Sequence, residues 1–222
     1  MNIGFIGTGL MGAPMIKNLL KSKHQISIFN RTISKAKKLK KYGAYLSYKI
    51  DELVKDKEII ITMLTDDKAV NDIIRSKTFL NNVCKQTTVI DMSSTKPSTA
   101  LDNYKTLKKK GVYFLDAPVS GGTKGAESAS LAIMVGGEKK IYKKNLKVLK
   151  MLGIPNYVGK PSSGQAAKLA NQIIVGITIG AVSEAIILCE KSGINSQNVL
   201  KSLEGGWADS KILSTHGLRM IK

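Results

Sequence analysis

Apolar and polar residues follow one another along the first 160 positions in short blocks of two kinds. Short continuous apolar runs, typical of strands buried on both faces of a parallel sheet, alternate with amphipathic runs of helical spacing. The predicted strands cover residues 3–6, 26–29, 58–62, 88–91, 112–115, 130–135 and 157–158. The predicted helices cover residues 15–20, 33–42, 50–54, 97–109 and 138–150. This alternation predicts an α/β fold with a doubly wound sheet.

The turn between the first strand and the first helix has the pattern Gly7-x-Gly9-x-x-Gly12. In a dinucleotide-binding turn, the first glycine makes the bend and the second lets the backbone approach a pyrophosphate. The third lets the helix pack close to the strand. The pyrophosphate then lies on free N–H groups at the helix N-terminus. The context of strand, turn and helix is the one the motif requires, so we expect residues 7–12 (Gly7, Thr8, Gly9, Leu10, Met11 and Gly12) to bind a dinucleotide.

The end of the second strand indicates which dinucleotide is bound. An NAD site places a carboxylate there for the ribose 2′-hydroxyl, but this strand ends in Asn30-Arg31-Thr32. A guanidinium at Arg31, with Asn30 and Thr32 as neutral donors, suits a 2′-phosphate. We therefore expect NADP(H) in preference to NAD(H), with Met63 and Leu64 at the end of a neighbouring strand also facing the cofactor.

The character of the sequence changes after the segment 160–164, beyond which it is all helical. We predict a Rossmann-type NADP-binding domain over residues 1–162, followed by the start of an all-α substrate or dimerisation domain over residues 163–222. The apolar run 173–188 is shorter than the roughly 20 residues of a membrane span and contains Glu184. We expect a buried helix there rather than a membrane segment, with another helix packed closely on its small residues, within the chain or in an oligomer.

The net charge of +19 raises the possibility of a polyanionic partner. Nearly all the positive charge is lysine, however, and Arg31, Arg75 and Arg219 are the only arginines. Base and phosphate recognition usually employs arginine, and no nucleic-acid-binding motif accompanies the lysine runs. We interpret the lysines as solvated helix faces that attract anionic ligands, and expect no specific nucleic-acid partner.

Two cysteines, Cys84 and Cys189, are too few for a disulfide framework, and the first residues lack the features of a signal peptide. We expect buried thiols in a cytoplasmic protein and no metal site.

Candidate chemistry lies at strand ends and near the predicted domain boundary. Neither His24 nor His216 lies in such a place, and the pair Tyr104-x-x-x-Lys108 sits in a lysine-rich helix whose surroundings do not match a tyrosine–lysine reductase. Ser120, Gly121 and Gly122 follow a strand end, where successive N–H groups can form an anion-binding nest for a substrate carboxylate.

Lys168 and Asn171 are one helical turn apart and share a face of the predicted helix. Burial of a lysine lowers its pKa toward the range useful for general acid–base chemistry. The alternative interpretation is a lysine that extends its charged end to solvent beside a capping asparagine.

Four segments together resemble the signature blocks of the β-hydroxyacid dehydrogenase family, in the family's order: residues 4–20, 91–97, 116–125 and 164–172. The resemblance implies Lys168 as catalytic acid/base and Asn171 as a residue that orients the substrate. It also implies that Ser120, Gly121 and Gly122 hold the substrate carboxylate, that Thr95 contacts the nicotinamide end, and that Met63 and Leu64 contact the adenosine side.

The substrate is less closely defined by this resemblance. Gln172 and the segment 205–210 resemble the tartronate semialdehyde (2-hydroxy-3-oxopropionate) reductase branch, whereas Asn30-Arg31-Thr32 resembles NADPH-using aldehyde reductases. Alternatives to a tartronate semialdehyde reductase or 3-hydroxyisobutyrate dehydrogenase are a glyoxylate/succinic semialdehyde reductase and a non-catalytic nucleotide-binding scaffold. Family members continue with further helices, so we expect a truncated chain whose full-length form is a homodimer or homotetramer.

Overall fold

The computed structural model describes residues 1–221, which divide into two compact units. The first runs from Met1 to Lys168 and the second begins at Leu169. The long helix α9 (Ser163–Lys191) starts at the predicted domain boundary, and its first turns belong to the first unit.

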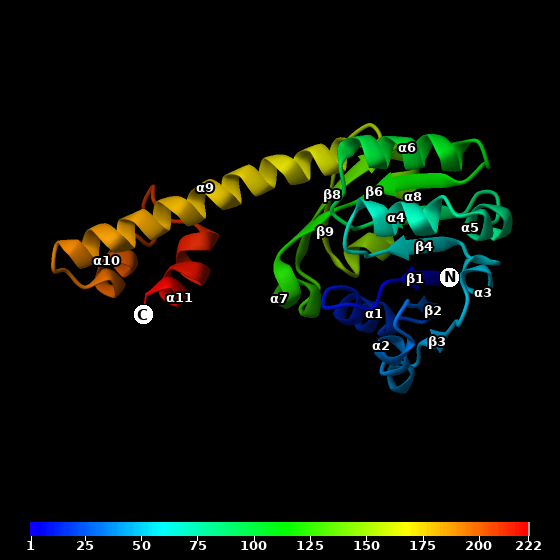
Figure 1. The fold of residues 1–222 in the computed structure, drawn as a ribbon, viewed down its shortest axis with the longest axis horizontal. Coiled ribbons are helices and arrows are strands. Elements are labelled where there is room, and N and C mark those ends of the chain that lie inside the picture. The colour runs from blue at the N-terminus through cyan, green and yellow to red at the C-terminus, as the bar shows by residue number, and fades with distance from the viewer. Residues whose placement is uncertain (222) are drawn as a thin grey trace. The chain divides into compact units, whose positions relative to one another are not determined.

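The first unit is built on one sheet that has nine strands in the described residues, in the order β3-β2-β1-β4-β5-β6-β8-β7, with β9 paired to β8 (Figure 1). Strands β1 to β6 pair in parallel, whereas β8 runs antiparallel to β6 and β7. The strands are β1 (Asn2–Ile6), β2 (Gln25–Phe29), β3 (Tyr45–Leu46), β4 (Ile59–Thr62), β5 (Thr88–Asp91), β6 (Tyr113–Asp116), β7 (Val119–Ser120), β8 (Leu131–Gly137) and β9 (Gly153–Gly159).

Helices connect the strands and cover both faces of the sheet. They are α1 (Gly12–Leu20), α2 (Ile33–Lys37), α3 (Ile50–Val54), α4 (Asp67–Ile74), α5 (Lys77–Asn82), α6 (Pro97–Lys108), α7 (Gly122–Glu127) and α8 (Lys139–Lys150), with a short 3-10 helix η1 (Lys40–Tyr42). Along β4, Ile59 and Ile61 pack in one core cluster with α1, α2 and α8, while Ile60 packs in a second with α3 to α6. The predicted α/β doubly wound fold is therefore confirmed.

The direction in which strands are added reverses at β1, which lies between β2 and β4. In open α/β sheets, ligands bind beside the carboxyl ends of the strands at such a switch point. The glycine turn after β1 and the Asn30-Arg31-Thr32 segment after β2 both lie at this edge. The topology thus brings the predicted cofactor residues together.

Three local predictions differ from the structure. The predicted helix 33–42 is instead α2 and η1, and the like-charged pair Lys37 and Lys41, four residues apart, disfavours one continuous helix. Strand β9 is longer than predicted. Helices α4, α5 and α7 and the short strands β3 and β7 were not predicted, because segments this short carry little periodic signal.

The second unit contains the remainder of α9, α10 (Ser196–Ser202), a π-helical turn η2 (Leu213–Gly217) and α11 (Leu218–Met220). Its core joins α9 to the later segments through Val182, Ile186, Leu200 and Leu213. This unit is all helical in the described residues, as predicted.

The sequence led us to expect a buried helix at residues 173–188. In the described chain, however, much of α9 is exposed. Ile173, Ile174 and Ile177 are 62%, 66% and 68% exposed, and a side chain added at Gly176 or Gly180 would meet open space. By length and composition alone α9 also qualifies as a membrane-crossing helix, with a mean hydropathy of 2.0 over 18 residues. Our prediction that a second copy of this chain packs against the exposed face of α9 is not tested by the structure of a single chain.

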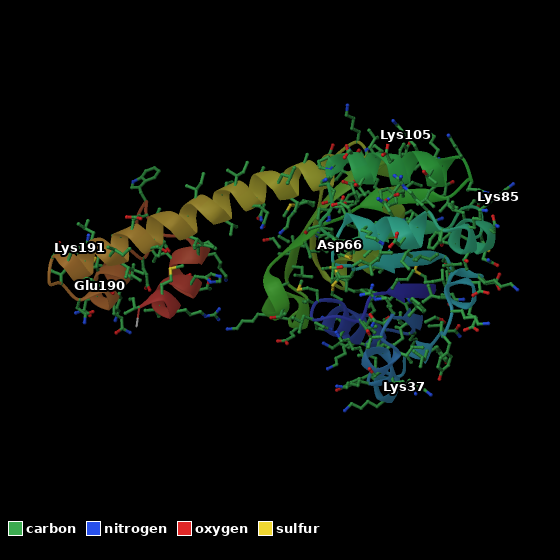
Figure 2. All side chains as sticks on the ribbon, viewed as in Figure 1. Lys37, Asp66, Lys85, Lys105, Glu190 and Lys191 are labelled. Atoms are coloured by element: carbon green, nitrogen blue, oxygen red, sulfur yellow. The ribbon has the colours of Figure 1, made fainter. Side chains whose placement is uncertain are left out.

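Most lysines of the first unit lie exposed on its surface. Lys37, Lys85 and Lys105 project outward from separate elements (Figure 2) and are exposed. Cys189 is buried as expected, whereas Cys84 is only half-buried.

Candidate functional site

The glycine turn after β1 has the close packing that its pattern predicts. Gly7 has a φ of +103°, and a side chain there would strike the backbone of Met63. A side chain at Gly12 would strike the carbonyl of Gly7, so α1 begins directly against the turn. Gly9 faces open space, which leaves its backbone accessible to a ligand. Leu10 is exposed and Met11 precedes the first residue of α1.

The segment after β2 is braced against this turn. Asn30 Oδ1 accepts a hydrogen bond from the N–H of Thr8 at 2.9 Å, and Asn30 Nδ2 donates to the carbonyl of Thr32 at 2.9 Å. The amide of Asn30 therefore shapes the loop in addition to any contact with a ligand. Arg31 and Thr32 beside it are exposed.

A cavity of about 290 Å³ opens beside these two loops. Its basic wall carries Arg31 and Lys35, and Met63 and Leu64 after β4 supply an apolar wall. Asp72 also lines it, paired with Lys68. The sequence did not predict Lys35 as a site residue, because a lysine within a lysine-rich run gives no distinguishing signal.

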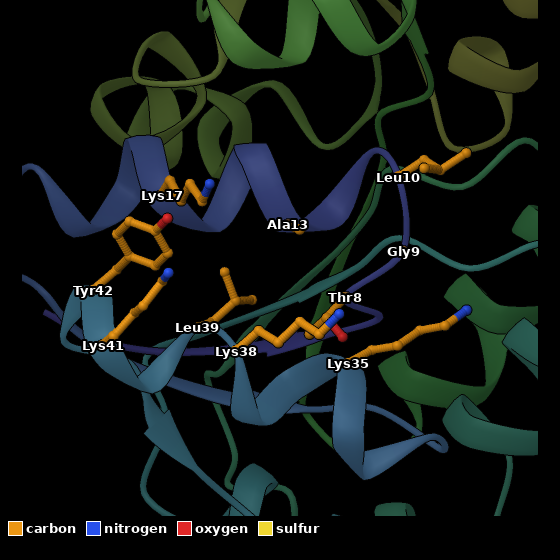
Figure 3. A pocket seen from close by; sticks show the side chains of 10 residues that line it. All are labelled: Thr8, Gly9, Leu10, Ala13, Lys17, Lys35, Lys38, Leu39, Lys41 and Tyr42. Atoms are coloured by element: carbon orange, nitrogen blue, oxygen red, sulfur yellow. The ribbon is translucent and has the colours of Figure 1, made fainter.

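A second, larger cavity of about 430 Å³ lies between α1 and the α2–η1 segment (Figure 3). Lys17 Nζ lies 4.4 Å from the ring centroid of Tyr42, and a side-chain hydrogen bond from Lys17 lowers the Tyr42 pKa. This cavity shares Thr8, Gly9 and Lys35 with the surroundings of the glycine turn, so the approach to the turn is strongly basic.

Buried polar groups occupy the carboxyl ends of β4 and β5. Asp91 is fully buried, and its Oδ1 accepts from Thr62 Oγ1 at 2.8 Å and from the N–H of Ser93 at 3.1 Å. Asp91 Oδ2 has no hydrogen-bond partner among the described residues. Burial raises the pKa of Asp91 to about 6, because the charged form is poorly solvated there.

Asp116 at the end of β6 holds the start of α9. Its carboxylate accepts from the N–H of Ser162 at 2.9 Å and from the N–H of Gln165 at 3.0 Å. Burial raises the pKa of Asp116 to about 6, although these backbone donors oppose the change. A side chain at Gly164 would lie 2.5 Å from the Asp116 carbonyl oxygen, so α9 packs directly on the strand end.

The side chain of Gln165 joins α9 to the segment after β5. Its Oε1 accepts from the N–H of Thr95 at 3.0 Å and its Nε2 donates to the carbonyl of Ser93 at 2.8 Å. Sequence reasoning assigned no role to Gln165, because a buried glutamine on a helix shows no pattern until its partners are known. Thr95 itself is buried, and its Oγ1 has no partner among the described residues.

Lys168 lies three residues beyond Gln165 on α9 and is half-buried. Desolvation lowers its pKa from the ordinary lysine value. Asn171 lies one turn further on, in the second unit, and its Nδ2 donates to Gln172 Oε1 at 3.0 Å.

The predicted nest lies where β7 ends and α7 begins. Gly121 and Gly122 have φ values of +136° and +61°, and a side chain at Gly122 would meet open space. Ser120 is half-buried at the end of β7. No hydrogen bond in the described part of the chain joins Ser120 to Lys168.

Two family models match the chain. Residues 2–190 match the model of the NAD-binding domain of 6-phosphogluconate dehydrogenase. Residues 162–222 match the model described as NAD-binding of NADP-dependent 3-hydroxyisobutyrate dehydrogenase. Fold, glycine turn and family models together define a nucleotide-dependent oxidoreductase.

Individual relatives narrow the class to one family. The chain is 38% identical to 2-hydroxy-3-oxopropionate reductase of Escherichia coli, over 100% of this chain and 76% of the relative. It is 37% identical to the uncharacterized oxidoreductase YkwC of Bacillus subtilis, over 99% and 77%. The structure of Mycobacterium tuberculosis 3-hydroxyisobutyrate dehydrogenase with L-serine matches 97% of this chain and 73% of that one, with a TM-score of 0.89 and 30% identity. The chain belongs to the β-hydroxyacid dehydrogenase family of NAD(P)-dependent enzymes that act on CH–OH groups.

Proposed function

We propose that this protein is an NADP(H)-dependent oxidoreductase that interconverts a small carboxylate-bearing semialdehyde and its hydroxy acid, with Lys168 as general acid/base. The observation that carries the proposal is the position of Lys168. The amine of Lys168 is half-buried and its pKa is lowered. Lys168 lies on α9, whose first turn is hydrogen-bonded to the segment after β5. The scaffold alternative does not account for a desolvated lysine at this position.

The loops at the strand ends fit a dinucleotide. Thr8 Oγ1 and Thr95 Oγ1 are buried without partners in the described residues, and the backbone at Gly9 is open. Buried polar groups are normally hydrogen-bonded, so these hydroxyls are suited to a ligand. Residues 7–12 would hold the pyrophosphate, Met63 and Leu64 the adenosine side, and Thr95 the nicotinamide end. When bound, the reduced nicotinamide supplies a hydride to the substrate carbon.

The preference for NADP(H) rests on the charge of the cavity beside β2. Arg31 and Lys35 line it and Thr32 adds a hydroxyl, whereas β2 ends without a carboxylate to accept from a 2′-hydroxyl. Asp72 also lines the cavity, but it is paired with Lys68. A 2′-phosphate would be held by charge-assisted hydrogen bonds, which are stronger than neutral ones.

The substrate carboxylate is assigned to Ser120 and the N–H groups of Gly121 and Gly122, and Asn171 would orient the remaining polar group. The left-handed φ of Gly122 at the start of helix α7 supports this assignment, because successive N–H groups of a left-handed and a right-handed residue converge on an anion.

In reduction, hydride transfer to the aldehyde carbon leaves negative charge on its oxygen. The Lys168 ammonium stabilises that charge and donates its proton to the oxygen, and the neutral amine then regains a proton from water. In oxidation the neutral amine accepts the hydroxyl proton. A lowered pKa favours this exchange, because desolvation makes the neutral amine easier to form.

We also propose a homodimer or homotetramer, located in the cytoplasm, with no specific nucleic-acid or membrane partner. The exposed isoleucines of α9 support self-association, because a large apolar surface is unfavourable in water. Analytical ultracentrifugation tests the oligomer, and a strictly monomeric protein at micromolar concentration would contradict it. A salt-dependent shift on DNA that is present at physiological ionic strength would contradict the absence of a nucleic-acid partner.

A screen of NADPH oxidation against tartronate semialdehyde, methylmalonate semialdehyde, succinic semialdehyde and glyoxylate tests the proposed function. We expect turnover with at least one carboxylate-bearing aldehyde and less with an uncharged aldehyde of the same length. Activity on glyoxylate or succinic semialdehyde alone would favour the alternative reductase. Tight NADPH binding without turnover on any of the four would favour the scaffold.

A further inference from the structure

The first turn of α9 is fixed to the sheet by contacts that leave it little freedom. The carboxylate of Asp116 accepts from the N–H groups of Ser162 and Gln165, at 2.9 and 3.0 Å. Gly164 lies against Asp116 so closely that an added side chain would be 2.9 Å from its Oδ2. These contacts set the position of the helix backbone relative to β6.

A second set of contacts links the same turn to β5 and runs through one side chain. Gln165 is fully buried, and its amide uses both ends on the segment after β5, accepting from the Thr95 N–H and donating to the Ser93 carbonyl. Ser93 in turn accepts, through Oγ, from the N–H of Leu64 at 2.9 Å. One amide thus connects α9 with both segments assigned to the cofactor.

We propose that Gln165 is a positioning residue for the reaction: its amide holds the first turn of α9 against Ser93 and Thr95, so that Lys168 and the nicotinamide-contact segment keep a fixed relation. The inference rests on the proposed role of Lys168. Residues three apart on a helix share a face, so the direction of the Lys168 side chain follows the turn that Gln165 anchors. A displacement of about 1 Å between a catalytic group and the reacting atoms is enough to lower a rate about 10²-fold.

An apolar residue of similar length would fill the same volume but would leave the Thr95 N–H and the Ser93 carbonyl without partners. Such unsatisfied buried groups are unfavourable, so the turn and the segment would separate or admit water. Water at this point would solvate Lys168 and move the pKa of its amine back toward the ordinary value. A side chain with a merely structural role would change stability without this change at Lys168.

The test compares Gln165→Met with Asn145→Leu. Asn145 is also a buried amide, and it donates to Thr88 at the opposite end of the same strand β5 and to the Ile141 carbonyl. Both variants should melt at a lower temperature than the wild type. Only Gln165→Met should lower kcat about 10- to 100-fold and raise the pKa of Lys168 in the cofactor-free protein. That pKa is followed by NMR of ¹³C-methylated lysines, with the Lys168 signal assigned by its loss in Lys168→Arg.

Gln165→Glu provides a second variant in case the methionine variant does not fold. A protonated glutamic acid donates to the Ser93 carbonyl and accepts from the Thr95 N–H, as glutamine does, whereas the carboxylate loses the donor. Asp91, Asp116 and Lys168 titrate nearby, so the wild type at each pH is the reference. The ratio of kcat for Gln165→Glu to that of the wild type should rise toward 1 as the pH falls from 8 to 5.5.

The positioning role is overturned if the Lys168 pKa of Gln165→Met equals that of the wild type and kcat falls no more than in Asn145→Leu. A ratio for Gln165→Glu that stays near 1 at every pH also overturns it. Failure of the proposed function gives a different result, because Lys168→Ala would then keep its turnover. The Lys168 pKa in the cofactor-free protein would still show whether Gln165→Met changes the surroundings of Lys168.

Discussion

Asn30 Oδ1 accepts a hydrogen bond from the backbone N–H of Thr8, so the residue that precedes Arg31 is tied to the glycine turn 22 positions earlier. The nitrogen of the same amide, Asn30 Nδ2, donates to the Thr32 carbonyl and fixes the other side of Arg31. The backbone that carries the guanidinium is therefore held at both ends. Preorganisation of this kind reduces the entropic cost of binding a 2′-phosphate.

Replacement of Arg31 by alanine should weaken NADPH binding and leave NADH binding nearly unchanged. Loss of a charged hydrogen bond to the 2′-phosphate is expected to reduce the binding free energy by about 1.5–3 kcal/mol. The dissociation constants of both cofactors, measured by calorimetry, test this directly. Lys150→Ala removes an equal charge at the end of α8 and serves as the control. Equal weakening of NADPH and NADH by Arg31→Ala would refute the assignment.

A side chain at Gly122 should impair recognition of the substrate carboxylate. The space in front of Gly122 is open, but its φ of +61° is unfavourable for alanine, so Gly122→Ala should distort the turn that presents its N–H. We expect KM for the acidic substrate to rise much more than the dissociation constant of NADPH. Steady-state kinetics with an acidic aldehyde and its uncharged analogue separates the two effects. If the unmodified enzyme reduces the uncharged analogue equally well, the nest does not bind a carboxylate.

Asp91 should make the folded state less stable as the pH rises. Its pKa is about 6 in the folded chain and 3.8 in the unfolded reference, so between these values the folded state binds a proton that the unfolded state has released. The contribution of Asp91 to stability is therefore complete below pH 3.8 and is lost as the pH rises through 6. By proton linkage the loss between pH 4 and pH 7 is about 2 kcal/mol.

Asp91→Asn removes this titration and keeps an oxygen acceptor for Thr62 and Ser93. The drop in unfolding free energy from pH 4 to pH 7, measured by urea denaturation, should be smaller in this variant than in the wild type. Glu190→Gln, at an exposed carboxylate (Figure 2), should leave the drop unchanged. Identical pH dependence in Asp91→Asn and the wild type would show that Asp91 is not protonated in the folded chain.

Local chemistry explains which parts of this structure could be predicted from sequence. The glycine turn after β1 follows from residues within a few positions, and the alternation of apolar runs gives the doubly wound sheet. Helix α7 was not predicted, because it is short and because the glycines at residues 121 and 122 favour a loop in isolation. The break between α2 and η1 falls within a lysine-rich run, whose like charges a hydrophobic pattern does not record.

The contacts around α9 lay beyond prediction for a different reason. Gln165 meets Thr95 across 70 positions, and Asp116 meets Ser162 across 46. Such pairs depend on how the strands are ordered in the sheet, and a single sequence does not encode that order locally. The exposed apolar face of α9 likewise has no counterpart within the described chain, although its composition predicted a partner.

Whether Lys168 transfers the proton in this reaction is decided by the kcat of Lys168→Ala. Loss of a general acid should lower kcat by about 10²–10⁴-fold while NADPH affinity and melting temperature stay close to those of the wild type. Lys168→Arg should not restore activity, because a guanidinium does not release its proton at neutral pH. Near-normal turnover by Lys168→Ala would contradict the claim and leave Lys168 as a lysine that only packs on α9.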